Sequence, residues 1–180
     1  LDFKNKLLSI KDKHVLIVGD YDCDGICATT ITKRLLEHLG IDNSYYIPSR
    51  IDEGYGLSEK IVSIAHKHHY DVIITVDNGV SATSSISLAN SLGIKVMIID
   101  HHEYVDIPDC YGFIHPNLLD KDFNKLSAGA LCYLLSTLFY EDDYSLVLGG
   151  LSILSDMVGV LNYNRYLLKK MMNILNTSDM

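Results

Sequence analysis

Short apolar runs alternate with longer segments of helical periodicity along the first two thirds of the chain. Apolar runs of a few residues are typical of strands that are buried on both faces of a sheet. The pattern predicts strands at 15–18, 45–47, 72–76, 96–99 and 112–114. Helical spacing predicts helices at 26–39 and 82–92, and a further helix that begins after an N-cap at Ser58. Three more helices are predicted in succession, at 128–139, 146–158 and 163–175. This order predicts an α/β fold: a parallel sheet of about five strands with helices on both faces, followed by a helical C-terminal segment.

Acidic side chains follow three of the predicted strands at the point where each strand ends. The residues are Asp20, Asp22 and Asp24 after the first strand, Asp77 after the strand at 72–76, and Asp100-His101-His102 after the strand at 96–99. Ligands of open α/β sheets bind beyond the carboxyl ends of the strands, so these clusters should meet at one edge. Clustered carboxylates repel one another and are costly to bury unless a cation lies between them. We therefore expect a metal site, and carboxylates with added imidazole suit Mn²⁺ or Mg²⁺.

Each cluster also has a simpler interpretation when it is taken alone. Asp24 could cap the following helix, and Asp77-Asn78-Gly79 could form a turn. Asp100 could begin a polar loop. Adjacent histidines point in different directions, so we expect one of His101 and His102 to bind metal and the other to face substrate. Asp100 could then orient one of the two rings.

Other polar positions leave two interpretations open. Asp156 lies in an otherwise apolar helical stretch, where either the metal site or a solvated helix end would satisfy its carboxylate. Arg50 could bind a phosphate or lie on the surface. Ser127-Ala128-Gly129 opens a helix, whose first N–H groups could hold a phosphate. The run of His66, His68 and His69 at a helix end predicts an ordinary solvated face.

The composition limits the class of protein. At 180 residues with 48% hydrophobic residues, the chain is long enough for one domain with a sizeable core. Its apolar runs are too short to span a membrane, and we see no secretory signal. Four scattered cysteines match neither a zinc site nor a disulfide framework, which predicts reduced thiols and a cytoplasmic location. The net charge of −8 argues against nucleic-acid binding unless a local basic surface or a further domain contributes.

Six ordered motifs resemble those of the DHH phosphoesterase superfamily, which is named after the sequence seen here as Asp100-His101-His102. The motifs lie at residues 19–25, 48–50 with 53–57, 75–81, 100–103, 127–129 and 156–158. They follow the family's order over nearly the whole chain. The sequence Glu53-Gly54-Tyr55-Gly56 is similar to the RecJ group of single-strand-specific 5′ exonucleases, rather than to the pyrophosphatase and cyclic-dinucleotide branches.

The resemblance implies a metal-dependent hydrolase of phosphodiester bonds that uses two Mn²⁺ or Mg²⁺ ions. By motif position, the implied metal ligands are Asp22, Asp24, Asp77, His101 and Asp156, with Asp77 bridging the two ions and Asp20 as a further candidate. His102 would contact the scissile phosphate or assist proton transfer, and Asp100 would act with it. The implied substrate-binding residues are Arg50, Asn78, Ser127, Ala128 and Gly129. The implied reaction releases 5′ mononucleotides from single-stranded DNA in repair and recombination.

Two departures from the family pattern affect this expectation. Gly159 stands where the family usually has proline, and the family's DHHA1 and oligonucleotide-binding domains are missing. We therefore expect residues 1–180 to form one DHH domain of a longer protein, with the missing domains and single-stranded nucleic acid, DNA favoured, as partners. The alternatives are an oligoribonuclease or cyclic-dinucleotide phosphodiesterase of the same superfamily, or a non-catalytic replication scaffold. The intact ligand set argues against a scaffold.

Overall fold

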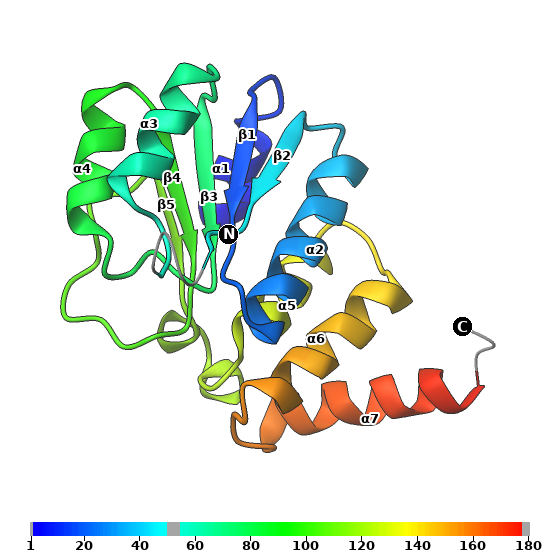
Figure 1. Cartoon of the computed structure of the whole chain (residues 1–180). Helices are drawn as coiled ribbons and strands as arrows, with labels where there is room; N and C mark the ends of the chain where they lie inside the picture. Colours follow the sequence, from blue (N-terminus) through cyan, green and yellow to red (C-terminus); the bar gives the residue numbers. More distant parts are fainter. Residues whose placement is uncertain (1, 50–54, 178–180) are drawn as a thin grey trace.

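A five-stranded sheet forms the centre of the computed structural model, which describes residues 2–49 and 55–177 (Figure 1). All neighbouring strands are parallel, in the order β2-β1-β3-β4-β5. The strands are β1 (Val15–Val18), β2 (Asn43–Tyr46), β3 (Val72–Val76), β4 (Lys95–Ile99) and β5 (Gly112–Ile114). Every residue of β1 and β3 is buried, as expected for strands that are covered on both faces. The predicted parallel sheet is confirmed.

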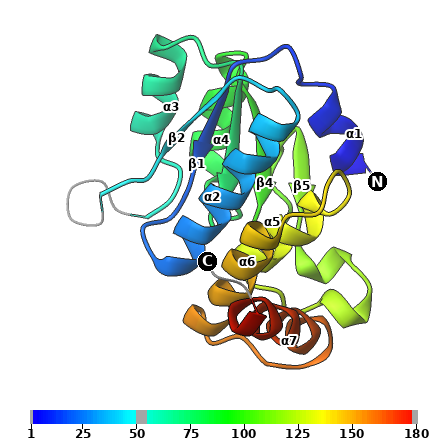
Figure 2. The same ribbon diagram turned by 90° about the vertical axis from the view of Figure 1, so that its right-hand side faces the viewer.

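Helices cover both faces of the sheet (Figures 1 and 2). One face is covered by α3 (Glu59–Lys67) and α4 (Thr83–Ser91). The other face is covered by α1 (Asp2–Leu8), α2 (Cys23–His38) and α5 (Ala128–Ser136). α6 (Asp143–Ser155) packs on α2 and α5, and α7 (Asn162–Thr177) packs on α6. The short 3₁₀ turns η1 (Pro116–Leu118) and η2 (Lys121–Phe123) lie between β5 and α5. Side chains alternate between the two faces: Ile17 of β1 packs with the α2 side, whereas Leu16 and Val18 pack with the α3 side.

The chain reverses its winding at β1, and this reversal opens the carboxyl edge of the sheet. β1 lies between β2 and β3, and the helix after β1 covers one face while the helices after β2 and β3 cover the other. In open α/β sheets such a switch point forms a crevice for ligands. The strand register places Val18 opposite Thr75 and Val76 opposite Ile99. The segments that follow β1, β3 and β4 therefore leave the sheet at the same edge.

Two helices begin earlier than the apolar pattern predicts, because acidic side chains cap them. α2 begins at Cys23 instead of at position 26, since Asp22 accepts a hydrogen bond from the Gly25 N–H at 2.9 Å. α6 begins at Asp143 instead of at 146, since Asp142 accepts from two N–H groups of the first turn. Both α5 and α6 also end earlier than predicted, at Ser136 and Ser155. The early end of α6 places Asp156 at the C-cap of the helix.

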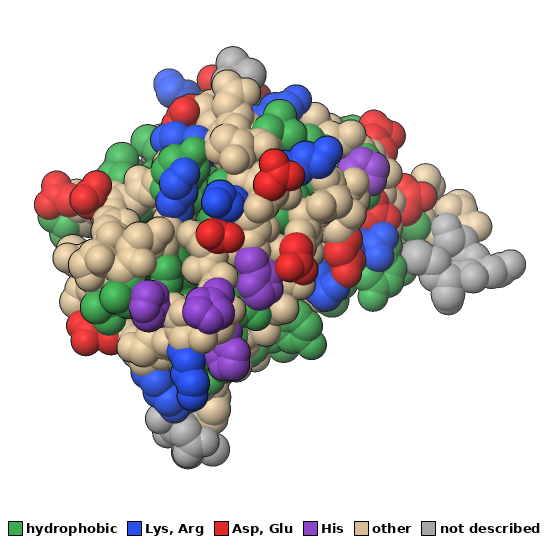
Figure 3. Space-filling model, turned by 90° about the horizontal axis from the view of Figure 1, so that it is seen from above, with side chains coloured by type: hydrophobic (Ala, Val, Ile, Leu, Met, Phe, Trp, Pro, Cys, Tyr) green, Lys and Arg blue, Asp and Glu red, His purple; other side chains and the backbone are tan. Residues whose placement is uncertain are grey.

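The end of the molecule at the amino ends of the strands lies opposite the carboxyl edge of the sheet. It carries side chains of both charges together with histidines (Figure 3). His66, His68 and His69 are exposed at the end of α3, in agreement with the predicted solvated helix end. Within residues 2–49 and 55–177, no helix has the length and apolar character that crossing a membrane requires.

Candidate metal centre

Acidic and imidazole side chains from four segments converge at the carboxyl edge of the sheet. Their ligand atoms form three overlapping groups, one of which is Asp77 with His101 and His102, and within each group all atoms lie within 4.8 Å of one another. A second group contains Asp20, Asp22 and Asp77, and a third contains Asp24, His101 and Asp156. The segments after β1, β3 and β4 supply most of these residues, and the end of α6 supplies Asp156. The structure thus brings together all six residues that the sequence analysis named as candidate metal ligands.

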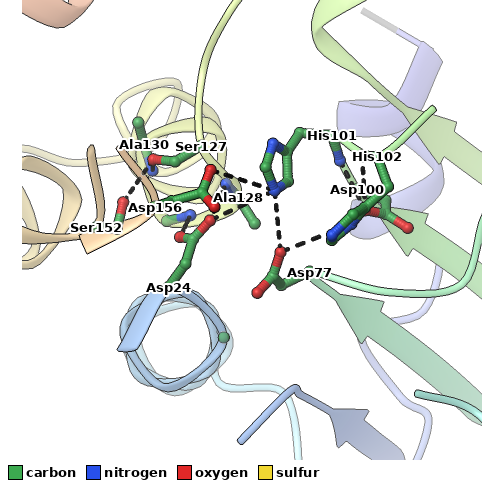
Figure 4. A network of polar contacts seen from close by, with 12 residues as sticks. Asp24, Asp77, Asp100, His101, His102, Ser127, Ala128, Ala130, Ser152 and Asp156 are labelled. Atoms are coloured by element: carbon green, nitrogen blue, oxygen red, sulfur yellow. Dashed lines mark hydrogen bonds and ion pairs between the residues drawn. The ribbon is translucent and has the colours of Figure 1, made fainter. Parts of the chain in front are cut away.

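His101 lies at the centre of the cluster (Figure 4). Its Nε2 is 3.2 Å from Asp77 Oδ1, 3.6 Å from Asp24 Oδ2 and 3.7 Å from Asp156 Oδ2. Nε2 and Asp77 Oδ1 are both buried, and neither has a hydrogen-bond partner among the described residues. Buried polar atoms without partners are costly, so their convergence on a small space is the arrangement that a cation would satisfy. The donors are carboxylate oxygens with one imidazole nitrogen, a set that suits Mn²⁺ or Mg²⁺.

The electrostatics of the carboxylates also fit a cation. Burial raises the pKa of Asp77 from 3.8 to about 7, with a further contribution from the negative charge of Asp24. Burial likewise raises the pKa of Asp24 from 3.8 to about 6, against opposing hydrogen bonds from Gly129 and Ala128. The protein groups alone therefore do not fully compensate these charges, whereas a divalent ion would. Asp77 has a left-handed backbone (φ 62°), a conformation that Asp adopts more readily than most residues.

Asp24 is held in place by the start of a second helix. Its Oδ1 accepts a hydrogen bond from the Gly129 N–H at 2.7 Å, and its Oδ2 accepts one from the Ala128 N–H at 2.8 Å. Ser127 caps α5 through the Ala130 N–H, and its hydroxyl lies 2.7 Å from the Ser152 hydroxyl. The N–H groups that we expected to hold a phosphate thus bond a carboxylate of the cluster. A role for Ser127, Ala128 and Gly129 in binding substrate stays a prediction.

The two adjacent histidines occupy different environments. His102 Nδ1 lies 2.8 Å from Asp100 Oδ1, and the two histidine rings are tilted by 52°. Asp100 is fully buried, and it also accepts hydrogen bonds from the backbone N–H groups of Val80, His101 and His102. The hydrogen bond to Asp100 raises the pKa of His102 from 6.5 to about 9. Burial alone would raise the pKa of Asp100. The hydrogen bonds from His102 and Val80 outweigh burial and hold this pKa below 3.8. Asp100 therefore orients His102, and His101 faces the carboxylates.

Two residues that contact the site were missing from the predicted set. The Tyr55 hydroxyl donates to the Asp77 carbonyl oxygen at 2.7 Å and lies 3.2 Å from His102 Nδ1. His115 Nε2 lies 3.0 Å from the His102 carbonyl oxygen, and His115 Nδ1 accepts from the Asn117 N–H at 3.1 Å. His115 directly follows β5. Because polar residues that follow parallel strands line the site, the sequence could have predicted His115 as a site residue. Tyr55 lies in one of the quoted motifs.

Two other predicted substrate-binding positions do not reach the cluster or cannot be placed. Asn78 is fully buried, and its side-chain amide donates to the carbonyl oxygens of Val18 at 3.0 Å and Val76 at 2.9 Å. It therefore links β1 to β3 beneath the site. Arg50, together with Glu53 and Gly54 of the same motif, lies outside the described residues.

Comparisons with known proteins agree with this geometry. The family described as "DHH family, N-terminal domain" matches residues 14–151. The single-stranded-DNA-specific exonuclease RecJ of Salmonella typhimurium is 40% identical over 129 residues, which are 69% of this chain and 22% of that protein. The protein of the same name from Escherichia coli is 35% identical over 158 residues, which are 81% of this chain and 27% of that protein. The chain thus spans about a quarter of the length of these relatives.

Solved structures of similar fold cover nearly the whole chain. An exonuclease RecJ bound to manganese aligns with a TM-score of 0.84 and 26% identity, over 96% of this chain and 48% of the other. RecJ from Thermus thermophilus in complex with Mn²⁺ aligns with a TM-score of 0.81 and 22% identity, over 99% of this chain and 28% of the other. Because the family match includes the acidic strand ends and the Asp100-His101-His102 sequence, this chain belongs to the DHH family.

Proposed function

We propose that this chain is the DHH domain of a metal-dependent exonuclease that releases 5′ mononucleotides from single-stranded DNA, in repair and recombination. The observation that carries the proposal is the convergence of Asp24, Asp77, His101 and Asp156 on one buried position at the carboxyl edge of the sheet. The relatives named single-stranded-DNA-specific exonuclease RecJ support the choice of substrate. The 5′ polarity rests on this likeness alone.

In this proposal two divalent cations, Mn²⁺ or Mg²⁺, occupy the cluster. Asp20, Asp22 and Asp77 would hold one ion, and Asp24, His101 and Asp156 would hold the other, with Asp77 close enough to both groups to serve as a shared ligand. Such a pair would supply an activated water molecule and would stabilise charge on the phosphate and the leaving oxygen. Among the solved structures of the same fold, those titled RecJ with Mn²⁺ and with Mg²⁺ support the choice of ions.

The chain's own residues position and protonate the substrate. His102 has a half-exposed side chain, and its Nδ1 is held by Asp100. Nε2 is therefore the ring nitrogen that is directed to a substrate oxygen. A protonated His102 stabilises negative charge on the phosphate and can deliver a proton to the leaving 3′ oxygen. The Tyr55 hydroxyl contacts both this ring and the Asp77 carbonyl oxygen. It therefore holds the proposed proton donor, His102, at a fixed distance from the proposed shared ligand, Asp77.

The acidity of the chain bears on how the strand is held. The net charge is −8, and the substrate is itself an anion. We therefore include in the proposal that other domains of a longer protein, of the DHHA1 and oligonucleotide-binding types, hold the rest of the strand. The chain's short length relative to the similar exonucleases supports this arrangement. A cytoplasmic location is also part of the proposal, supported by four free cysteines.

Nucleotide release from a labelled strand tests the proposal. A 5′-labelled single-stranded DNA is incubated with the chain and Mn²⁺, in parallel with a dinucleotide. We expect labelled mononucleotide from the long strand, at a modest rate, and no release in EDTA. Cleavage of the dinucleotide alone would instead favour an oligonucleotide-degrading enzyme of the same superfamily.

A matched pair of variants separates the site from the rest of the surface. Asp77→Asn removes the proposed bridging charge, and Asp12→Asn removes an exposed charge in the loop before β1. We expect release to be abolished in the first variant and retained in the second. Equal activity in the two variants would exclude the cluster as the catalytic centre.

A further inference from the structure

A pocket of about 580 Å³ lies beside the metal cluster, on the side of α3 and α4. It is lined by the segment that leads into α4, by Tyr55 to Leu57, and by the loop that carries His102. His102 Nδ1 is 3.9 Å from Asp77 Oδ1, so the pocket and the cluster share a wall. The proposed hydrolysis uses His102 and Tyr55 at the edge of this pocket, and it leaves the part around the start of α4 without a role.

The pocket contains an uncapped helix start. Ala82 precedes α4 and provides no side-chain cap, and the N–H groups of Thr83, Ser84 and Ser85 have no hydrogen-bond partner within residues 2–49 and 55–177. Alanine is an unfavourable residue at this position by about 1 kcal/mol. Unpaired N–H groups at a helix start attract anions, because they add hydrogen bonds to the positive end of the helix dipole.

A second feature of the pocket also indicates a ligand. Ser85 lines the pocket although it is only 4% exposed, and its hydroxyl makes no hydrogen bond within the described part of the chain. The hydroxyl oxygen is not sealed from the pocket, so a group bound there can reach it. A ligand oxygen in the pocket would satisfy it. The more exposed Ser81 and Ser84 line the same pocket and bring two further hydroxyl groups.

The acidic residues that line the pocket bear on whether an anion can bind there. His102 lines one wall of the pocket. Asp100 also lines the pocket, but its two oxygens already accept hydrogen bonds from Val80, His101 and His102. Among the described residues of the lining, Glu103 is the remaining acidic one, and it opposes an anion.

We propose that this pocket binds a phosphate group of the substrate strand next to the phosphate that is hydrolysed. The inference rests on the proposed function, because it assigns the pocket to the same strand. The N–H groups at the start of α4 and the Ser81, Ser84 and Ser85 hydroxyl groups hold the phosphate oxygens. This second phosphate fixes the register of the strand relative to His102, and so the pocket selects an oligonucleotide over an isolated phosphate ester.

Amide chemical shifts test binding without hydrolysis. Inorganic phosphate is titrated into the isotope-labelled chain in EDTA, so that no cation at the cluster attracts it. We expect the amide signals of residues 81–85 to shift in a saturable way. Ser84→Asp places a negative charge at the site and should weaken phosphate binding at least about tenfold, a loss of about 1.4 kcal/mol. Ser87→Asp, on an exposed position of the same helix outside the lining, should bind phosphate like the wild type.

Stability measurements distinguish a lost site from a damaged fold. An acidic residue in the first turn favours a helix, so Ser84→Asp should unfold at the same temperature as the wild type or higher. Ser85→Ala removes a hydroxyl group of the pocket lining; it should weaken phosphate binding several-fold and leave the fold intact. Absence of saturable shifts in residues 81–85, or equal phosphate affinity in wild type and Ser84→Asp, would overturn the inference.

Substrate kinetics connect the pocket to the strand. In the Mn²⁺-loaded chain, Ser84→Asp should raise the KM for single-stranded DNA about tenfold relative to Ser87→Asp. Equal KM values in these two variants would exclude the pocket as a strand subsite. If the wild type hydrolysed no substrate, the proposed function would fail, and the amide shifts alone would still decide whether the pocket binds phosphate.

Discussion

His102 Nδ1 and Asp100 Oδ1 lie 2.8 Å apart, and this contact gives the two adjacent histidines different surroundings. Asp100 is fully buried and fixed by backbone N–H groups, so it holds the His102 ring firmly. His101, one residue earlier, turns its Nε2 to Asp24, Asp77 and Asp156. A single three-residue sequence after β4 thus delivers one imidazole to the cluster of carboxylates and one to the proposed substrate side.

This separation predicts different defects for the two histidines. His102→Asn should bind Mn²⁺ like the wild type and lower the turnover rate about 100-fold or more, since a positioned proton donor contributes an effect of that size. His101→Asn should weaken Mn²⁺ binding by more than about tenfold. Calorimetric Mn²⁺ titrations and initial rates check both. If His102→Asn lost Mn²⁺ binding while His101→Asn kept it, the roles would have to be exchanged.

The metal-free chain should lose stability as the pH rises. Raised pKa values, about 6 for Asp24 and about 7 for Asp77 against an ordinary 3.8, mean that the folded state favours their protonated forms, so stability falls from about pH 4 to about pH 7. His102, raised from 6.5 to about 9, contributes stability below pH 6.5 that is lost by about pH 9. Urea unfolding in EDTA at pH 5.5, 7 and 8.5 measures this trend. Saturating Mn²⁺ should flatten it, and stability that rises with pH in EDTA would contradict the account.

Tyr55 provides a test of positioning. Tyr55→Phe removes the hydroxyl that donates to the Asp77 carbonyl oxygen and contacts His102. We expect turnover to fall about tenfold, Mn²⁺ binding to persist, and the free energy of unfolding to change by about 1 kcal/mol. Tyr45→Phe, at an exposed tyrosine of β2, is the matched control and should leave turnover unchanged. Unchanged turnover in Tyr55→Phe would remove this residue from the site.

The contact between α2 and α6 predicts a stability effect away from the cluster. Asp142 caps α6 and forms an ion pair with Arg34 of α2, with Arg34 Nη2 at 2.8 Å. Asp142→Ala should lower the free energy of unfolding by about 1–2 kcal/mol, because it removes a cap and an ion pair. Asp143→Ala, next to it and exposed, should cost about 0.5 kcal/mol or less. Chemical denaturation compares the two, and equal losses would contradict the capping role.

The sheet could be predicted because each strand carries its own signal. Val15–Val18 and Val72–Val76 are uninterrupted apolar runs, and their burial on both faces matches that pattern. α1 could not be predicted, since its apolar contribution to the core is only Phe3 and Leu7. Two apolar residues in a short polar stretch do not establish a helical period. This helix forms because those two side chains pack on the finished core.

For the site, too, the local sequence predicted some positions, and others depend on contacts between distant segments. The carboxyl-edge rule placed Asp77 and Asp100 correctly, since each directly follows a strand. The hydrogen bonds from Ala128 and Gly129 to Asp24 join segments more than 100 residues apart, and no local pattern encodes them. Asp156 could face the cluster or solvent from sequence alone. The packing of α6 against α2 and α5 places its carboxylate 3.7 Å from His101 Nε2.

The number of Mn²⁺ ions bound at equilibrium tests the central claim most directly. The chain and its Asp77→Asn variant would be dialysed against Mn²⁺ and the bound metal measured per folded molecule. Asparagine tolerates the left-handed backbone at this position, so the variant should fold. We predict two ions per wild-type chain and fewer in the variant. One ion or none in the wild type, or two ions retained without the Asp77 carboxylate, would contradict a two-cation centre bridged by this residue.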